Sequence, residues 1–346
     1  MAQSSKSNLF FIDFLRCVAT IAVVAIHVLG PWRELFGLVG ESQWLAAASY
    51  NALLRWAVPI FFMISGALLL TSLAPQQAPF DCHRYLQRRV AKVVVPFLIW
   101  SVLYAIIAGF DGNGWHSEQT LSTLTQANNQ PTWYHLWFFY SFIPVYFVIP
   151  LLAPLLYKMT SQQVKLLLYA WFVLTLMNWF DVTSFLRQPL LLYSGYLVLG
   201  WYLIHKDHRE DVGLWLWAGG AMLVFNVFGT WQLSHDHGQY AIFFMGYENF
   251  NTAIIAAMIF VLAQTYAEQI TGKIRQGISL IARYSLGIYL IHPLFLLPIR
   301  NIEAGYYALF GSNWLAIPTL TLVVLLLSLL STMALAKLPL LQKIVP

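Results

Sequence analysis

The first apolar stretch of the chain, residues 9–30, carries ionisable side chains within a segment long enough to cross a bilayer as one helix. Asp13, Arg16 and His27 lie inside it. Such groups at membrane depth are costly, and they are usually paired with one another or functional. Arg16 and His27 are eleven residues apart, which puts them on nearly the same helix face, roughly 16 Å apart along the axis. The stretch therefore predicts a spanning helix with a cation near one end and a titratable imidazole near the other.

The composition of the whole chain is that of an integral membrane protein. Of its 346 residues, 59% are hydrophobic and only 10% are charged, against roughly 25% charged residues in a soluble domain. The two cysteines indicate neither a disulfide framework nor a zinc site, and the histidines lack paired ligand spacing, so we expect no metal. The first stretch is longer than the apolar core of a signal peptide, and we expect it to be retained.

Hydropathy predicts an all-α bundle of ten transmembrane helices in a single domain, residues 1–346. The predicted spans are about 9–30, 50–72, 90–110, 134–156, 163–181, 188–205, 213–232, 245–267, 281–300 and 313–336.

Basic residues alternate between the two sides of this predicted bundle. With both termini in the cytoplasm, only Arg33, Arg187 and Arg300 fall in outer segments. Fourteen fall in inner segments: Lys6, Arg84, Arg88, Arg89, Lys92, Lys158, Lys165, Lys206, Arg209, Lys273, Arg275, Arg283, Lys337 and Lys343. This bias is typical of cytoplasmic loops, so we expect both termini to be cytoplasmic. A basic strip for nucleic acid would not alternate in this way, which excludes that partner.

The second and third predicted spans add polar groups at two depths. Arg55 lies near the outer end of the second span, and Ser65 lies ten residues further in, near the depth expected for Arg16. The third span is entered from the cytoplasm through RYLQRRVAKVVVP. A helix there presents a cationic edge that suits phosphates, made of Arg84, Arg88, Arg89 and Lys92.

Four further candidates lie in later spans, His292 within the ninth and the other three near the outer ends of theirs, and each also has a plainer interpretation. His135 and Trp137 occur in PTWYHLWFFYSF, where aromatic residues are typical of an interfacial belt. The plainer interpretation of Glu248 is a solvated loop acid, and that of His292 is a packing residue of the bundle. For Arg16 the plainer interpretation is a structural ion pair with Asp13, and for His27 it is a hydrogen-bonded packing histidine.

Five segments in order resemble the acyltransferase-3 family of multispan membrane O-acyltransferases. The family's first helix has Arg, ten residues and then His, matched by Arg16 and His27 after IDFLR. Its R-x-x-V-P-x-F-F-x-x-S-G element is matched from Arg55 to Gly66. The basic stretch before the third span, HLWF at 135–138 and SLGIYLIH at 285–292 are similar to further family segments. The resemblance covers nearly the whole chain.

The resemblance implies transfer of an acyl group, usually acetyl from cytosolic acetyl-CoA, to a hydroxyl of a cell-surface or lipid-linked glycan at a bacterial inner membrane. A neutral imidazole can take the proton of a sugar hydroxyl, and we expect His27 to be this base. Arg16 and Arg55 are its expected catalytic partners, on the donor arm and on the oxyanion or the acceptor. The expected acetyl-CoA contacts are Arg16, Ser65, Arg88, Arg89 and Lys92, and the expected acceptor contacts are His135, Trp137, Glu248 and His292.

These assignments predict a tunnel from a basic cytosolic mouth to His27, with direct transfer rather than a covalent acyl-enzyme. The alternative function is a transporter or flippase for a lipid-linked sugar, which would use the same intramembrane charges for passage. A membrane scaffold or sensor is a third reading, which the intramembrane ionisable groups disfavour.

Overall fold

The computed structural model describes residues 10–74, 81–180, 182, 185, 187–208, 210–300, 310–339 and 341–345. Lys6 and Arg209, which entered the count of inner basic residues, and predicted span limits 9 and 181 lie outside this part. The described chain is almost entirely helical. Its strands are β1 (Phe110–Asp111) and β2 (Gly114–Trp115), which pair antiparallel as one hairpin.

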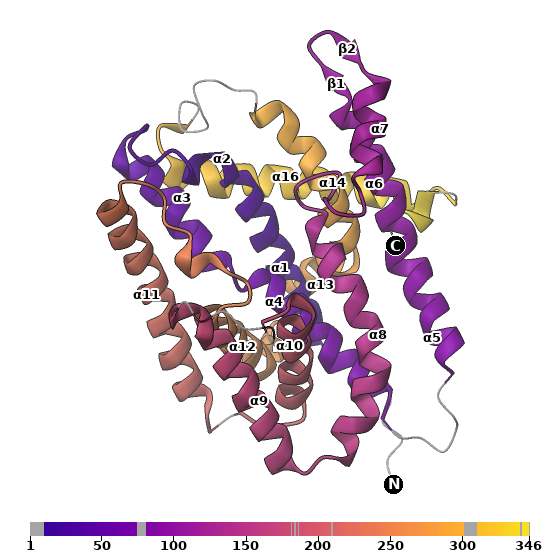
Figure 1. The fold of residues 1–346 in the computed structure, drawn as a ribbon, viewed down its shortest axis with the longest axis vertical. Coiled ribbons are helices and arrows are strands. Elements are labelled where there is room, and N and C mark those ends of the chain that lie inside the picture. The colour runs from indigo at the N-terminus through magenta and orange to yellow at the C-terminus, as the bar shows by residue number, and fades with distance from the viewer. Residues whose placement is uncertain are drawn as a thin grey trace.

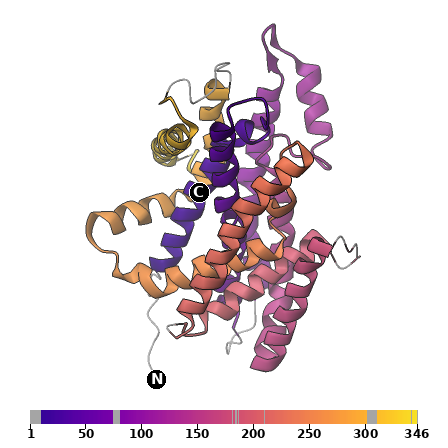
Figure 2. The same cartoon turned by 90° about the vertical axis from the view of Figure 1, so that its left-hand side faces the viewer.

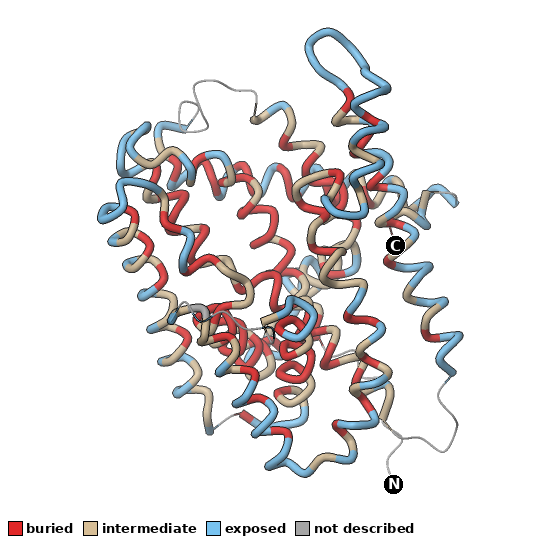
Figure 3. The backbone as a smooth tube through the Cα atoms, in the orientation of Figure 1, coloured by how far each residue is buried: buried red, intermediate tan, exposed pale blue. Residues whose placement is uncertain are grey.

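Helix α1 (Phe10–Val28) is enclosed by helices from both halves of the chain. It contacts α3 (Glu41–Leu54), α4 (Ala57–Ser65), α12 (Phe250–Tyr266), α13 (Gly272–Arg283), α14 (Ser285–Arg300) and α16 (Asn313–Ala336). In the most apolar window of α1, 67% of residues are buried, against 11% for α11 (Val212–His237). The charged first stretch therefore forms the middle of the bundle, and α11 runs along its edge (Figure 1, Figure 3).

The other elements surround this centre. Helices α5 (Cys82–Arg89) and α6 (Val95–Ala108) follow one edge, and the β1–β2 hairpin with α7 (Ser117–Thr125) projects beyond them (Figure 1). Helix α16 lies across the bundle and is seen end-on in Figure 2. The remaining segments are α2 (Gly30–Arg33), η1 (Gly66–Leu70), η2 (Val90–Val94), α8 (Trp137–Lys158), α9 (Ser161–Leu176), η3 (Met177–Phe180), α10 (Pro189–Ile204), η4 (Phe243–Met245), η5 (Ala267–Gln269) and η6 (Leu341–Lys343).

Seven helices of the described chain are long and apolar enough to cross a membrane, or up to eight if a bent pair counts as one span. That pair is α13 and α14, which meet at 76° where one straight span was predicted over 281–300. Helix α10 is apolar but shorter than these spans, and α9 is not among the helices long and apolar enough to cross a membrane. The all-α membrane class is thus confirmed, while ten spans and cytoplasmic termini stay predictions.

Two glycines set the depth of the second span against α10. A Cβ atom on Gly66 would lie 2.0 Å from the carbonyl oxygen of Leu197, and one on Gly200 would lie 2.1 Å from that of Met63. Small residues let membrane helices approach this closely. The crossing therefore fixes the position of Ser65, next to Gly66, against α10.

Candidate active site

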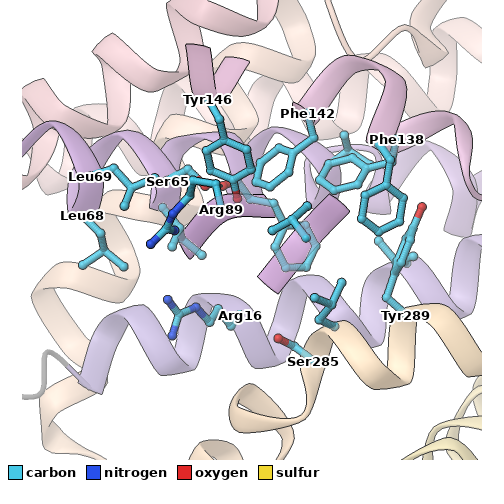
Figure 4. Close-up of a pocket in the computed structure, with 17 residues that line it drawn as sticks. Arg16, Ser65, Leu68, Leu69, Arg89, Phe138, Phe142, Tyr146, Ser285 and Tyr289 are labelled. Atoms are coloured by element: carbon cyan, nitrogen blue, oxygen red, sulfur yellow. The ribbon is translucent and has the colours of Figure 1, made fainter. Parts of the chain in front are cut away.

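An apolar cavity of about 260 Å³ lies beside α1, between α4, η1, η2, α8 and α14. Figure 4 shows Arg16 and Arg89 approaching it from opposite sides at one end, with Tyr289 at the other end. We call it the inner cavity. It is lined by Arg16, Val23, Val58, Phe61, Ile64, Ser65, Leu68, Leu69, Arg89, Val93, Phe138, Phe139, Phe142, Tyr146, Ser285, Leu286 and Tyr289.

Arg16 is both paired and available to the inner cavity. Its Nη1 lies 3.6 Å from Oδ1 of Asp13, and Oδ2 of Asp13 accepts a hydrogen bond of 3.2 Å from Ser279. The plainer interpretation of an ion pair is thus confirmed. Since Arg16 also lines the cavity, the ion pair orients a guanidinium that a ligand can reach. Ser65 lines the same cavity, at the depth that helix geometry predicted.

The basic edge before the third span reaches the inner cavity through Arg89. Arg84, Arg88 and Lys92 are exposed on the surface. The Arg89 guanidinium lies 5.7 Å from the ring centres of both Tyr85 and Tyr146. Its Nε is buried and has no hydrogen-bond partner among the described residues. Arg89 thus offers a buried donor to an anion at this cavity.

Both polar walls of the inner cavity are next to π-helical turns. Segment η1 begins directly after Ser65, and η2 begins directly after Arg89. Such turns are rare and occur mostly at functional sites. Pro96 favours the π-helical turn η2, because it has no N–H to donate to the carbonyl of Lys92 in a regular α-helix. The wider turn changes which side chains of this segment face inward.

A second, larger cavity of about 690 Å³ lies at the other end of α1. We call it the outer cavity. It is more polar than the inner one and rich in aromatic side chains. It is lined by Ile26, His27, Arg33, Glu34, Asn51, Arg55, Tyr134, Trp137, Tyr240, Ile242, Met245, Gly246 and Tyr247.

Arg55 organises one wall of the outer cavity. Its Nε donates to the carbonyl oxygen of Met245 at 2.5 Å, and its Nη1 donates to the Tyr247 hydroxyl at 2.9 Å. The guanidinium lies 3.9 Å from the centre of the Tyr247 ring, and the Trp137 ring stacks on the same ring at 5.3 Å. The wall is a layered group of one cation and two aromatic rings, which suits a neutral or anionic ligand with apolar faces.

His27 faces the outer cavity with another histidine behind it. Its Nδ1 lies 2.6 Å from Nε2 of His292, and the two rings are within 8° of parallel. His292 is fully buried and does not line the outer cavity. Sequence reasoning assigned His292 to the acceptor, whereas the structure places it against the expected base. Tyr289 lies three residues before His292 on α14, and its hydroxyl donates to the carbonyl oxygen of His135.

His135 and Arg300 complete the surroundings of this histidine pair. The His135 ring is fully buried, 5.6 Å from the ring of His292 and 6.4 Å from that of His27. Neither of its nitrogens has a partner in the part of the chain that the structure describes. Arg300 donates to the backbone carbonyl of His27 at 3.2 Å and lies over the Tyr134 ring. Sequence reasoning did not single out Arg300, Tyr134 or Tyr289.

Glu248 lies outside the linings of both cavities. It is half-buried in the loop before α12 and hydrogen-bonds Tyr193. Burial raises the pKa of its carboxyl, and the charge of Arg187 and the Tyr193 hydrogen bond oppose this rise. Glu248 is therefore a partner of the buried Tyr193 and not part of either cavity lining.

The two cavities meet end to end. On α1, Val23 lines the inner cavity and Ile26 the outer one; on α8, Phe138 lines the inner cavity and Trp137 the outer one. The division is therefore about one helical turn thick, roughly 5 Å. Instead of the single predicted tunnel, the structure has two chambers divided by aromatic side chains.

Comparison with known proteins gives this arrangement a family. Residues 9–333 match the family model described as "Acyltransferase domain", the acyltransferase 3 family. The chain is 30% identical over 181 residues to "Succinoglycan biosynthesis protein ExoH" of Rhizobium meliloti (strain 1021), over 48% of each chain. It thus spans about half the length of this curated relative. No solved structure matches the chain. Because the family model covers nearly all of it, the chain belongs to the acyltransferase 3 family.

Proposed function

We propose that this member of the acyltransferase 3 family moves an acetyl group from acetyl-CoA to a hydroxyl of a cell-surface or lipid-linked glycan, with His27 as general base. The observation that carries the proposal is that His27 lines a polar, aromatic cavity about one turn from the end of an apolar cavity with two guanidinium groups. A donor and an acceptor can approach one another at that point.

The inner cavity suits the donor. Its apolar lining fits an acyl-pantetheine arm, and Arg16 and Arg89 supply the positive charge that an anionic donor needs. At about 260 Å³ it is smaller than the roughly 300–1,000 Å³ of sites that enclose drug-sized ligands. The arm therefore enters while the nucleotide of CoA stays at the surface, where Arg84, Arg88 and Lys92 are exposed.

The outer cavity suits a saccharide acceptor. The stacked rings of Trp137 and Tyr247 present apolar faces, and Arg55, Asn51 and Tyr240 present donors beside them. The name of the Rhizobium relative refers to succinoglycan biosynthesis, which supports a polysaccharide or its precursor as the acceptor. At this site the acceptor hydroxyl faces His27.

The reaction then needs one base and no covalent enzyme intermediate. His27 takes the hydroxyl proton as the sugar oxygen attacks the thioester carbon. A C–O bond forms, the C–S bond breaks, and the proton passes to the thiolate of CoA. General-base assistance of this kind contributes about 10²–10⁴-fold. Arg55, in the lining of the outer cavity, and Arg16, in that of the inner cavity, are the cations that we assign to the developing oxyanion and the donor arm.

The deciding experiment follows labelled acetyl groups. Protein purified into lipid nanodiscs is incubated with [¹⁴C]acetyl-CoA and an extract of bacterial surface glycans and lipid-linked saccharides. We expect label in the glycan fraction with the wild type, and a loss of at least about 100-fold with His27→Ala. The matched control is His237→Ala, which replaces an exposed histidine at the end of α11.

Normal transfer by His27→Ala at normal protein level would remove His27 from catalysis. Movement of a lipid-linked sugar across the membrane without consumption of acetyl-CoA would support a transporter or flippase instead.

A further inference from the structure

We propose that His292 is a positioning residue that fixes the tautomer of His27, and that Pro293 frees the Tyr289 carbonyl that fixes His292. The inference rests on the proposed function of His27 and adds the group behind it. It is carried by hydrogen bonds between α1 and α14, which are far apart in the sequence.

The chain of contacts begins at a proline. In an α-helix the carbonyl of residue 289 accepts from the N–H of residue 293, but Pro293 has no N–H. The carbonyl oxygen of Tyr289 lies instead 2.7 Å from Nδ1 of His292. The carbonyl of Ile288 lies 3.2 Å from the same nitrogen. Because a carbonyl oxygen only accepts, Nδ1 of His292 carries the hydrogen.

The second step follows from the valence of a neutral imidazole. With a hydrogen on Nδ1, His292 has a lone pair on Nε2. Nδ1 of His27 lies 2.6 Å from this atom, so it is the donor of that bond. His292 is fully buried, and Arg300 already places a cation at the His27 backbone. Both conditions favour a neutral His292.

The third step concerns the other ring nitrogen of His27, Nε2. With its hydrogen on Nδ1, His27 has its basic lone pair on Nε2, which forms no hydrogen bond with the described part of the chain. This is the nitrogen that can take a proton from an acceptor in the outer cavity, which His27 lines. A base oriented by a third group is the usual arrangement in nucleophilic catalysis. Here the third group is a neutral imidazole.

Four variants test this arrangement by steady-state kinetics in nanodiscs, with acetyl-CoA and the glycan extract. His292→Gln keeps an acceptor near the former Nε2 position, whereas His292→Phe keeps a ring and removes the acceptor. Pro293→Ala restores the N–H that competes for the Tyr289 carbonyl. The matched control is Pro298→Ala, in the same helix and more than one turn beyond His292.

We expect His292→Phe to lower kcat between about tenfold and about 10⁴-fold, the range seen when an orienting partner is lost. The KM for acetyl-CoA should stay within about twofold, since His292 does not line the inner cavity. His292→Gln should recover part of the loss, Pro293→Ala should show a smaller one, and Pro298→Ala should match the wild type. A wild-type kcat in His292→Phe, with His27→Ala inactive, would overturn the inference.

A second readout needs no activity. In protein labelled with ¹⁵N-histidine, the nitrogen shifts report which ring nitrogen carries hydrogen, and the His27 signals are those absent from His27→Ala. We expect hydrogen on Nδ1 of His27 in the wild type, and a mixture of tautomers in His292→Phe. Hydrogen on Nε2 in the wild type would refute the inference even if acetyl transfer proceeds. A wild type that has the expected tautomer but transfers no acetyl group would refute the proposed function alone.

Discussion

Arg16 and His27 lie on the same helix and line two different cavities. Helix α1 is thus a wall shared by both chambers, with a guanidinium in the inner one and an imidazole in the outer one. Under the proposed function, the donor binds on one side of this helix and the acceptor on the other. Variants on the two sides should therefore change different kinetic constants.

The donor side is tested by neighbouring arginines. Arg89→Ala should raise the KM for acetyl-CoA by about tenfold or more, because a hydrogen bond to a charged group is worth about 1.5–3 kcal/mol. Arg88→Ala should change it by less than about fivefold, because Arg88 is exposed and surface charges contribute about 0–1 kcal/mol. The measurement is initial rate against acetyl-CoA concentration at fixed glycan. Equal effects of the two variants would contradict donor binding at the inner cavity.

The acceptor side is tested at Arg55. Arg55→Lys keeps the charge but loses the fork that holds the Met245 carbonyl and the Tyr247 hydroxyl together. We expect the KM for the glycan to rise about tenfold, the equivalent of one hydrogen bond at about 1.4 kcal/mol, with an unchanged KM for acetyl-CoA. Tyr247→Phe, which keeps the ring under Trp137, should have the smaller effect. A rise in the KM for acetyl-CoA alone would place Arg55 on the donor side.

Helix geometry made part of this site readable from the sequence. Residues on one helix have a fixed spacing, so the separation of Arg16 and His27 and the depth of Ser65 follow from their numbers alone. The membrane class follows from composition. The contact of His27 with His292 joins residues 265 apart along the chain, and no local pattern contains it. The one local signal was the spacing of Tyr289, His292 and Pro293 within SLGIYLIHP.

The helical period of four along the basic edge did not identify the basic residue that reaches the inner cavity. Arg84, Arg88 and Lys92 share a helical face, and the structure leaves them exposed. Arg89, on the adjacent face, lines the inner cavity. The π-helical turn η2 follows Arg89 directly and shifts the register of the next turn, which a regular helix does not anticipate. The bend of 76° between α13 and α14 is likewise not anticipated by the apolar pattern of 281–300.

The close crossing of the second span and α10 should be intolerant of any side chain. Gly200→Ala would place a methyl group 2.1 Å from the carbonyl oxygen of Met63, and overpacking of this kind costs about 1–3 kcal/mol. Gly220→Ala is the control: it lies in α11 with no atom within 4 Å of the added group, and alanine favours a helix by up to about 1 kcal/mol. Thermal unfolding in detergent should show a lower Tm for the first variant only. An unchanged Tm in Gly200→Ala would contradict the packing.

Glu248 should make stability depend on pH in a direction that its environment sets. Burial raises the pKa of this carboxyl above its ordinary value of 4.5. Between that value and the raised one, the folded protein keeps a proton that the unfolded chain has released, so the contribution of Glu248 to stability falls as pH rises. Glu248→Gln removes this pH-dependent contribution to stability. The Tm difference between Glu248→Gln and wild type should therefore move in favour of the variant from pH 4.5 upward and level off above the raised pKa. Parallel Tm curves would show that the carboxyl titrates normally, and a difference that moves in favour of the wild type would show that Arg187 and Tyr193 outweigh burial.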